Sequence, residues 1–404
     1  MFPWHELCIY ACTMEQKALP TMSLWLLAGT IALASACGDS IGVSPGGGSP
    51  GPGGGSPGTN GDAMPPSDGG PPDAARADVA PPGPDAAPTP DAGCDVPPPP
   101  SQLIGWATEM GGTTGGEGGS TVIVTTLAEL TAAARGTTPT LIQVQGTISG
   151  SVSIGSNKTI VGVCGASFVG HLGLNRSANV IVRNLTIVGF NCTDNPNDCS
   201  GGADAITVQG QSQHLWFDHD DISDGSDGNL DITHGSDFIT ISWTKFHYSG
   251  RRVDPAGASG GHQFSNLIGH SDNNAAEDTG HLTITFHHDW WADNVVERMP
   301  RVRFGQVHLF NNLYTAAAND YCIGVGVGAN IRDENNVFVG VKNPIDSTSF
   351  SDAQSTIQSI GPLYENITGT TQDIGGAAFQ PPYGYTLEPT SAIAAEIMAG
   401  AGPR

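Results

Sequence analysis

Short apolar runs recur along the second part of the chain, and each run contains a pair of polar or aromatic residues. The runs are rich in β-branched and aromatic side chains and read VIVRNLTIVGF, LWFDHDDI, FITISWTKF, LTITFHHDWW, VHLFNNLY and IRDENNVF. The second residues of the pairs are Asn184, His219, Trp243, His288, Asn312 and Asn336, separated by 35, 24, 45, 24 and 24 positions. A period of 24 with two insertions predicts a solenoid in which additional residues leave the coils as loops.

This period favours a single-stranded right-handed parallel β-helix with about 24 residues and about three short strands per coil. Propeller blades are longer, at about 40–50 residues, so a propeller is the weaker alternative. Helical patterns are confined to residues 127–134 and to a short stretch near 393–398. The insertions fall between residues 184 and 218 and between 243 and 287. If both leave the coil at the same turn, they form the walls of a groove.

The first hundred residues have a different composition from the rest. Residues 24–36 form an apolar stretch that is too short for a membrane span and typical of a signal peptide. The stretch ends in Ala34-Ser35-Ala36-Cys37, which resembles a bacterial lipobox, although ordinary cleavage after Ala36 is an alternative. We therefore interpret 1–37 as a signal peptide or lipoprotein leader, with translation starting at Met1, Met14 or Met22.

Residues 38–100 are mostly Gly, Pro, Ser, Ala and Asp, and they cannot bury enough apolar surface to offset the entropy of ordering. We expect a flexible tether here and one folded domain from 101 to 404. The whole chain is then either secreted or a bacterial cell-surface lipoprotein anchored through a lipid on Cys37.

The charge of the chain limits its partners. The formal net charge is −24, and residues 101–404 contain 29 acidic and 13 basic residues. This balance argues against binding to nucleic acid or to anionic membranes. Basic side chains are concentrated in only two places, Arg251-Arg252 and the stretch ERMPRVRFG, which contains Arg298, Arg301 and Arg303.

Three arginines so close together suit a ligand with carboxylates or phosphates, because the planar guanidinium matches the geometry of those groups. An ion-pair network is the alternative. Pro300 excludes a regular helix, and residues 302–310 alternate like a strand. On one strand, Arg301 and Arg303 would face the same way and Val302 the other.

Three aspartates form a second candidate group. Asp204 lies in GGADAITV, and Asp227 and Asp231 lie in SDGNLDIT. On coils about 4.8 Å apart these carboxylates can converge, and hard oxygen ligands favour Ca²⁺. The alternative is that each aspartate caps a turn.

Histidines and cysteines give weaker signals. Adjacent histidines on a strand face opposite ways, so His287 and His288 are poor partners for one ion. We expect His219, His288, Asn312 and Asn336 to stack between coils. Export permits disulfides, and Cys192 and Cys199 flank a polar loop and are the best pair. Spacing does not assign Cys94, Cys164 or Cys322.

Several of these stretches together resemble polysaccharide lyase family 1, the pectate lyases, over residues 101–345. They are WFDHDDISDGSDGNLDITHGSDFITISWTKFH, LIGHSD and ERMPRVRFGQVHLFNN. The resemblance implies the parallel β-helix fold, a catalytic role for Arg298 and substrate binding by Arg303. It also implies Ca²⁺ binding by Asp204, Asp227 and Asp231. Some members have a further acidic ligand where this chain has Gly202.

The chain departs from the family pattern after His247. Members commonly carry a substrate-binding lysine there, whereas this chain has HYSGRRVDPAGASGGHQFSN without a lysine. Arg251, Arg252 and His262 are the candidates to replace it.

The resemblance implies a Ca²⁺-dependent β-elimination on α-1,4-linked polygalacturonate by a monomeric enzyme. Free guanidinium has a pKa above about 12, so an arginine base implies an alkaline optimum. The alternatives are a pectin lyase acting on methyl-esterified chains and a noncatalytic pectin-binding β-helix. A hydrolase would need a suitably separated carboxylate pair, and Asp220 and Asp221 are adjacent and expected to face opposite ways.

Overall fold

The computed structural model describes residues 102–190, 203–250 and 262–404, all within the unit Pro82–Arg404. The predicted leader and tether, the pair Cys192–Cys199, Arg251 and Arg252 lie outside the described residues. Cys164 is disulfide-bonded, and Cys322 is free. No helix in the described ranges is long and apolar enough to cross a membrane.

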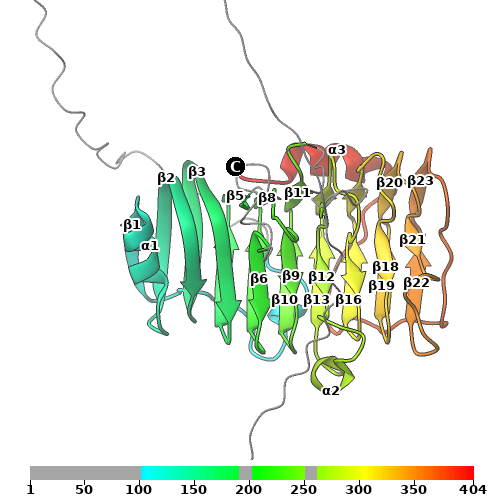
Figure 1. Ribbon diagram of the computed structural model, residues 1–404, viewed down its shortest axis with the longest axis horizontal. Coiled ribbons are helices and arrows are strands. Elements are labelled where there is room, and N and C mark those ends of the chain that lie inside the picture. The colour runs from blue at the N-terminus through cyan, green and yellow to red at the C-terminus, as the bar shows by residue number, and fades with distance from the viewer. Residues whose placement is uncertain (1–101, 191–202, 251–261) are drawn as a thin grey trace, which may run out of the picture. The chain divides into compact units, whose positions relative to one another are not determined.

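The described strands are all in one parallel sheet that winds into a β-helix with three faces (Figure 1). The first face consists of β4 (Ala178–Arg183), β7 (Gln213–Asp218), β10 (Asp237–Ser242), β13 (Thr283–His287), β16 (Gln306–Phe310), β19 (Asn330–Glu334) and β22 (Thr356–Ile360). The second face consists of β5 (Thr186–Val188), β8 (Asp221–Ser223), β11 (Lys245–His247), β14 (Trp290–Trp291), β17 (Leu313–Tyr314), β20 (Val337–Val339) and β23 (Leu363–Glu365). The third face consists of β6 (Ile206–Gln209), β9 (Leu230–Ile232), β12 (Leu267–Ile268), β15 (Arg301–Val302), β18 (Ile323–Val325) and β21 (Ile345–Asp346). The predicted parallel β-helix is confirmed.

The N-terminal end of the helix is built from longer strands. These are β1 (Ser120–Val124), β2 (Thr140–Ile154) and β3 (Lys158–Asn175), and β3 pairs with the first strand of every face. Helix α1 (Leu127–Ala134) has the predicted bounds. A capping box between Thr126 and Glu129 starts it, and its buried Leu130 and Ala134 join the core.

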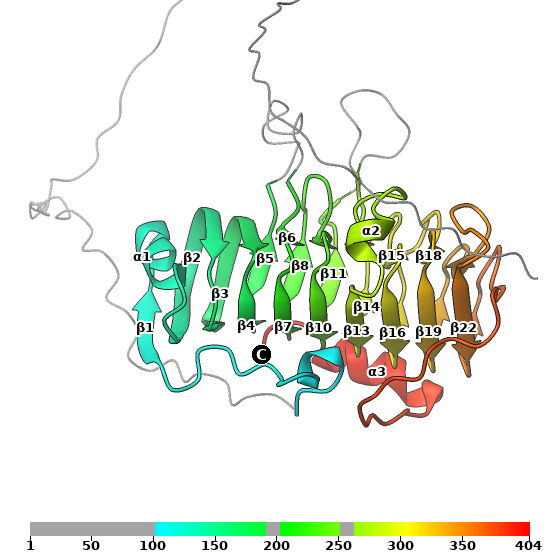
Figure 2. The same ribbon diagram turned by 90° about the horizontal axis from the view of Figure 1, so that it is seen from below.

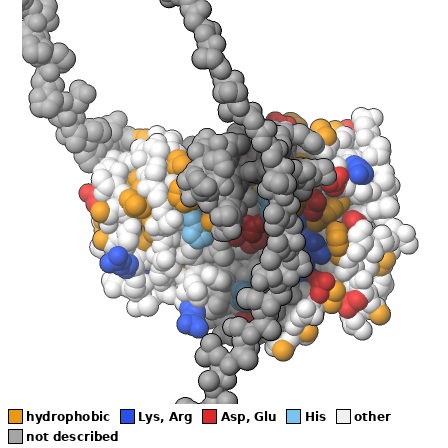
Figure 3. Space-filling view, in the orientation of Figure 1, with side chains coloured by type: hydrophobic (Ala, Val, Ile, Leu, Met, Phe, Trp, Pro, Cys, Tyr) orange, Lys and Arg blue, Asp and Glu red, His pale blue; other side chains and the backbone are white. Residues whose placement is uncertain are grey.

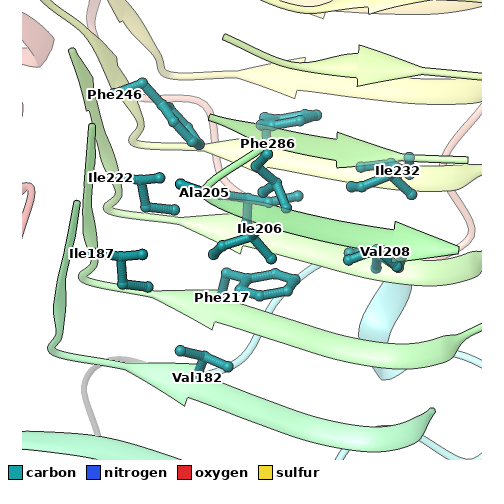
Figure 4. Close-up of a cluster of buried hydrophobic side chains, with 14 of the residues drawn as sticks. Val182, Ile187, Ala205, Ile206, Val208, Phe217, Ile222, Ile232, Phe246 and Phe286 are labelled. Carbon is teal, nitrogen blue, oxygen red and sulfur yellow. The ribbon is translucent and has the colours of Figure 1, made fainter. Parts of the chain in front are cut away.

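The core is a column of apolar side chains stacked from coil to coil (Figure 4). On the second face, partners in register point inward and form one stack: Ile187, Ile222, Phe246, Trp291, Tyr314, Phe338 and Tyr364. Ring centroids in this stack lie 4.6 Å apart for Trp291 and Tyr314 and 4.3 Å apart for Tyr314 and Phe338. These aromatic rings fill the interior of the β-helix in the coils that also carry the candidate functional site.

The register largely confirms the predicted period. Successive partners on the first face are Val180, Leu215, Ile239, Ile284, Val307 and Ile331, which gives offsets of 35, 24, 45, 23 and 24. One coil is therefore a residue shorter than predicted. The residues equivalent to His288 are Asn311 and Asn335, not Asn312 and Asn336.

At the turn from the first face to the second face, one residue in each of six coils has a left-handed backbone conformation. Asn184, His219, Trp243, His288, Asn311 and Asn335 have φ between 50° and 57°. The predicted stacking holds for His219 and His288, whose rings lie 5.6 and 4.4 Å from the ring of Trp243. Asn312 and Asn336 also stack from coil to coil, as a buried ladder in which the Asn312 N–H donates to Asn336 Oδ1 at 2.7 Å.

The C-terminal segment docks on this turn (Figure 2). Asn311 and Asn335 donate to the carbonyls of Thr386 and Glu388, and Asn184 accepts the N–H of Arg404. Helix α3 (Thr390–Gly400), predicted near 393–398, buries Ile393 and Ile397 against Leu313 and Val337. The remaining helical pieces are η1 (Trp106–Thr108) and α2 (Ala275–Asp278).

The single strand predicted over 302–310 is wrong, because the chain turns between β15 and β16. Phe304 takes a left-handed φ of 58° at this turn. The predicted alternation survives locally: Val302 is fully buried, and Arg301 and Arg303 on either side of it are half-buried.

Candidate functional site

The candidate residues gather at the corner where the second face turns into the third face. Asp204 precedes β6, Asp227 precedes β9 and Arg298 precedes β15. The first insertion lies between β5 and β6, and much of the second lies between β11 and β12, so both leave the coil at this corner. The rest of the second insertion, which contains α2, lies between β12 and β13.

Asp204 and Asp231 form a buried acidic pair. Each is less than a tenth exposed, and a Cβ added to Gly228 would lie 3.0 Å from Oδ1 of both carboxylates. The Thr207 hydroxyl donates to Asp204 Oδ2 at 2.8 Å, and the Leu267 N–H donates to Asp231 Oδ1 at 2.9 Å. Asp204 Oδ1 is buried without a hydrogen-bond partner in the part of the chain that the structure describes.

The pair carries charge that its surroundings compensate poorly. Burial, together with the charge of Asp227, raises the pKa of Asp204 to about 6. Burial and then the charge of Asp204 raise the pKa of Asp231 well above its ordinary value. The positive charge of Arg298 acts the other way on both. Two carboxylates that disfavour each other's ionisation favour a bound cation between them.

Asp227 stands apart from this pair. Its Oδ1 lies 2.8 Å from Nδ1 of His262, and both side chains are about half exposed. Its negative charge still raises the pKa of both Asp204 and Asp231. Across the described ranges, no group of three His, Cys, Asp or Glu side chains is placed to hold a metal ion. The structure thus brings two of the three predicted aspartates together, and the role of the trio in Ca²⁺ binding stays a prediction.

Arg298 lies at the same corner, in a left-handed backbone conformation with φ of 63°. Its Cζ lies 4.0 Å from the centroid of the Phe264 ring, and its Nε has no hydrogen-bond partner among the described residues. Its backbone is fixed, because the carbonyl accepts the N–H of Asn266 at 2.7 Å. The guanidinium is therefore held by an aromatic face and lies within electrostatic range of the acidic pair.

The other two arginines of the cluster have different contacts. Arg303 donates from Nε to the carboxylate of Asp272 and from Nη1 to the carbonyl of Gly269 at 2.9 Å. Arg301 stacks on Phe350, with Cζ 3.8 Å from the ring centroid. Burial and then the charge of Arg303 lower the pKa of Arg301. The cluster is thus a set of mutually repelling cations, with Arg303 already placed to bind a carboxylate.

The two adjacent histidines correct one prediction. His288 directly follows β13 and has a left-handed backbone conformation, so strand alternation does not apply to it. Its Nδ1 lies 2.9 Å from Nδ1 of His287, and the two rings meet at 88°. Burial lowers the pKa of His288 to about 4, and its Nε2 lies 3.2 Å from Glu388. This pair belongs to the docking surface of the C-terminal segment.

Three contributors to the site were missed from the sequence. Gly228 leaves the space in front of the acidic pair, Phe264 covers Arg298, and Asp272 pairs with Arg303. Asp272 lies in LIGHSD and Gly228 in SDGNLD, two stretches that the resemblance had already marked. Phe264 had no signal in the sequence, because it follows an insertion and contacts Arg298, which lies 34 positions further along the chain.

Acidic side chains lie at the centre of the face shown in Figure 3, and basic side chains lie beside them. The fold and this corner define a parallel β-helix protein whose arginines and paired carboxylates suit an acidic ligand bound together with a cation.

Comparison with known proteins identifies the family. A family model described as pectate lyase matches residues 100–403. "Probable pectate lyase B" of Aspergillus terreus is 39% identical over 300 residues, which cover 71% of this chain and 81% of that protein. "Pectate trisaccharide-lyase" of Bacillus licheniformis is 33% identical over 320 residues, covering 74% and 86%.

A solved structure agrees. The pectate lyase from Bacillus sp. N165, in complex with trigalacturonate, matches with a TM-score of 0.60 and 25% identity. The match covers 75% of this chain and 99% of that one. The chain belongs to the pectate lyases of polysaccharide lyase family 1, it is a polysaccharide lyase, and its β-helix is right-handed.

Proposed function

We propose that the protein is a Ca²⁺-dependent pectate lyase that cleaves α-1,4-linked polygalacturonate by β-elimination to 4,5-unsaturated oligogalacturonates. The observation that carries the proposal is the buried pair of Asp204 and Asp231 facing Gly228, with the charge of Arg298 acting on both. The trigalacturonate in the Bacillus sp. N165 structure supports an acidic uronate substrate.

The residues of the corner fit Ca²⁺. Asp204 and Asp231 offer hard oxygen ligands, Asp204 Oδ1 lacks a hydrogen bond, and the missing side chain of Gly228 leaves room beside them. Asp227 lies close enough to contribute charge. Bound there, Ca²⁺ supplies positive charge that neutralises the substrate carboxylate and makes the hydrogen at C5 more acidic.

Arg298 is the proposed base. It removes the C5 proton, the electron pair forms the C4–C5 double bond, and the glycosidic oxygen leaves from C4. A guanidinium must be neutral to accept a proton, and free guanidinium has a pKa above about 12. The rate should therefore rise with alkaline pH, and a maximum near pH 5 would contradict an arginine base.

Arg303 is the proposed clamp for a uronate carboxylate. Its ion pair with Asp272 supports this role, because the half-buried guanidinium already donates to a carboxylate whose side chain is exposed. Arg251, Arg252 and His262 remain the candidates for the further cation of the substrate cleft. The structure leaves Arg251 and Arg252 undescribed, and His262 already uses Nδ1 to bond Asp227.

The same proposal extends to the rest of the chain. Residues 1–37 direct export, 38–100 tether the monomeric lyase domain 101–404, and Cys192 bonds to Cys199. The relatives include fungal and bacterial proteins, so lipidation of a bacterial-type Cys37 rests on the leader sequence alone.

One assay tests the proposed reaction. Purified protein is mixed with polygalacturonate or with highly methyl-esterified pectin, in Ca²⁺ or in chelator, and the ultraviolet absorbance of the unsaturated uronate is followed. We expect absorbance from polygalacturonate with Ca²⁺ and none with chelator. Activity on esterified pectin that survives chelator would contradict the proposal, as would new reducing ends without absorbance.

A further inference from the structure

Phe264 has a backbone that is fixed on both sides along the β-helix axis. Its carbonyl accepts the hydroxyl of Tyr248 at 2.8 Å and the N–H of Asn229 at 3.2 Å. On the other side it forms a parallel bridge with Glu297, and Ser265 beside it donates to the Glu297 carbonyl at 3.0 Å. The residue next to Arg298 in sequence is thus the bridge partner of Phe264.

The ring of Phe264 is fixed as well. It packs against His262, with ring centroids 4.8 Å apart, and His262 is in turn held by Asp227. The guanidinium carbon of Arg298 lies 4.0 Å from the centroid of the same ring. Since Arg298 Nε makes no hydrogen bond with the described residues, the aromatic face is a main restraint on the guanidinium.

We propose that Phe264 is the positioning residue for Arg298: its ring fixes the plane of the guanidinium and shields one face of it from water. This inference rests on the proposed function, in which Arg298 removes the C5 proton. An aromatic face attracts a guanidinium and, at the same time, restricts its rotation. A base that must meet one C–H bond loses rate when it samples other orientations, even if the substrate binds as before.

The chain contains a matched control. Phe350 stacks on Arg301 at 3.8 Å, the same kind of contact on a neighbouring arginine to which we assign no chemical step. Comparing variants of Phe264 and Phe350 therefore separates the general effect of losing a ring stacked on an arginine from the specific effect of losing the ring on Arg298.

The test measures kcat and KM on polygalacturonate with Ca²⁺ for Phe264→Leu, Phe264→Tyr and Phe350→Leu, with the unfolding midpoint of each. Phe264→Leu should lower kcat about tenfold and leave KM within about twofold, since a guanidinium–ring contact is of this order. Phe264→Tyr, which keeps the ring, should recover most of kcat. Phe350→Leu should change kcat by less than about twofold.

The inference is overturned if Phe264→Leu keeps the wild-type kcat, if Phe264→Tyr is as slow as Phe264→Leu, or if the loss appears in KM alone. If Phe264→Leu does not fold, Phe264→Met takes its place and must show the same selective loss. A wild-type protein that makes no unsaturated product would overturn the proposed function and this inference with it. An active wild type with an equally active Phe264→Leu would overturn only this inference.

Discussion

Replacing Asp204 with Asn should stabilise the protein when Ca²⁺ is absent. Burial and the charge of Asp227 raise the pKa of Asp204 from 3.8 to about 6. The folded protein therefore holds this proton more tightly than the unfolded chain does. Ionised Asp204 is a destabilising group whose cost is absent below pH 3.8, grows as pH rises, and is complete above about pH 6.

The size of the effect follows from that difference. A shift of roughly two pKa units at about 1.4 kcal/mol per unit is about 3 kcal/mol. Asn keeps an oxygen that can accept the Thr207 hydroxyl and removes the charge. We expect Asp204→Asn to exceed the wild-type unfolding free energy by about 3 kcal/mol at pH 8 in chelator, and by little at pH 4.

Urea unfolding at both pH values, with chelator and with Ca²⁺, measures this directly. Added Ca²⁺ should stabilise the wild type at pH 8 and should stabilise Asp204→Asn much less. The exposed Asp293→Asn is the control and should stay within about 0.5 kcal/mol of the wild type. If Asp204→Asn is no more stable than the wild type in chelator at pH 8, the charge of the acidic pair is not poorly compensated in the folded protein.

Three further predictions concern other parts of the fold and the site. Gly228→Ala places a methyl group 3.0 Å from Oδ1 of Asp204 and Asp231, so titration calorimetry should show at least a tenfold weaker affinity for Ca²⁺. Gly384→Ala, where a methyl group meets no atom within 4 Å, is the control and should leave the affinity unchanged. An unchanged affinity in Gly228→Ala would exclude this space as the ion site. Asn312→Leu removes the acceptor of the Asp289 N–H and one donor to the Phe286 carbonyl, and should cost about 1–3 kcal/mol in urea unfolding; a loss below about 0.5 kcal/mol would show that the ladder adds little. Although burial opposes it, hydrogen bonds from His308, Arg332 and Tyr385 lower the pKa of Glu334 from 4.5 to about 2. The stability that ionised Glu334 contributes is then complete above pH 4.5 and is lost toward pH 2. Glu334→Gln should therefore lower the unfolding free energy by about 3 kcal/mol at pH 7, and by less as pH falls. A loss that stays constant with pH would contradict this role of Glu334.

The sequence predicted the repeat well because inward side chains must recur on every coil. Apolar residues such as Phe217, Ile241 and Phe286 stand in register, and any slip would expose them. The repeat positions were assigned to Asn312 and Asn336, one residue after the true equivalents Asn311 and Asn335, because two consecutive asparagines occupy each of these turns. Only backbone conformation distinguishes the left-handed Asn311 from the ladder residue Asn312.

The site was predicted less completely than the fold. The positions of Asp204, Asp231 and Arg298 at one corner follow from the coil period and from the resemblance. The contacts of Asp227 with His262 and of Arg298 with Phe264 join residues about 35 positions apart across an insertion. Periodicity carries no information on such pairs, since the path of an inserted loop is set by its own packing.

The proposed role of Arg298 as the base is tested most directly by comparing Arg298→Ala with Arg135→Ala on polygalacturonate in Ca²⁺ at alkaline pH, with the initial rate of unsaturated uronate as the readout. Arg135 is an exposed residue at the end of α1 and serves as a matched loss of one arginine. Removal of the base should lower kcat by about 10²–10⁴-fold, with the Arg135 variant within about twofold of the wild type. An Arg298→Ala enzyme that still forms the unsaturated product at near wild-type rate would contradict Arg298 as the base.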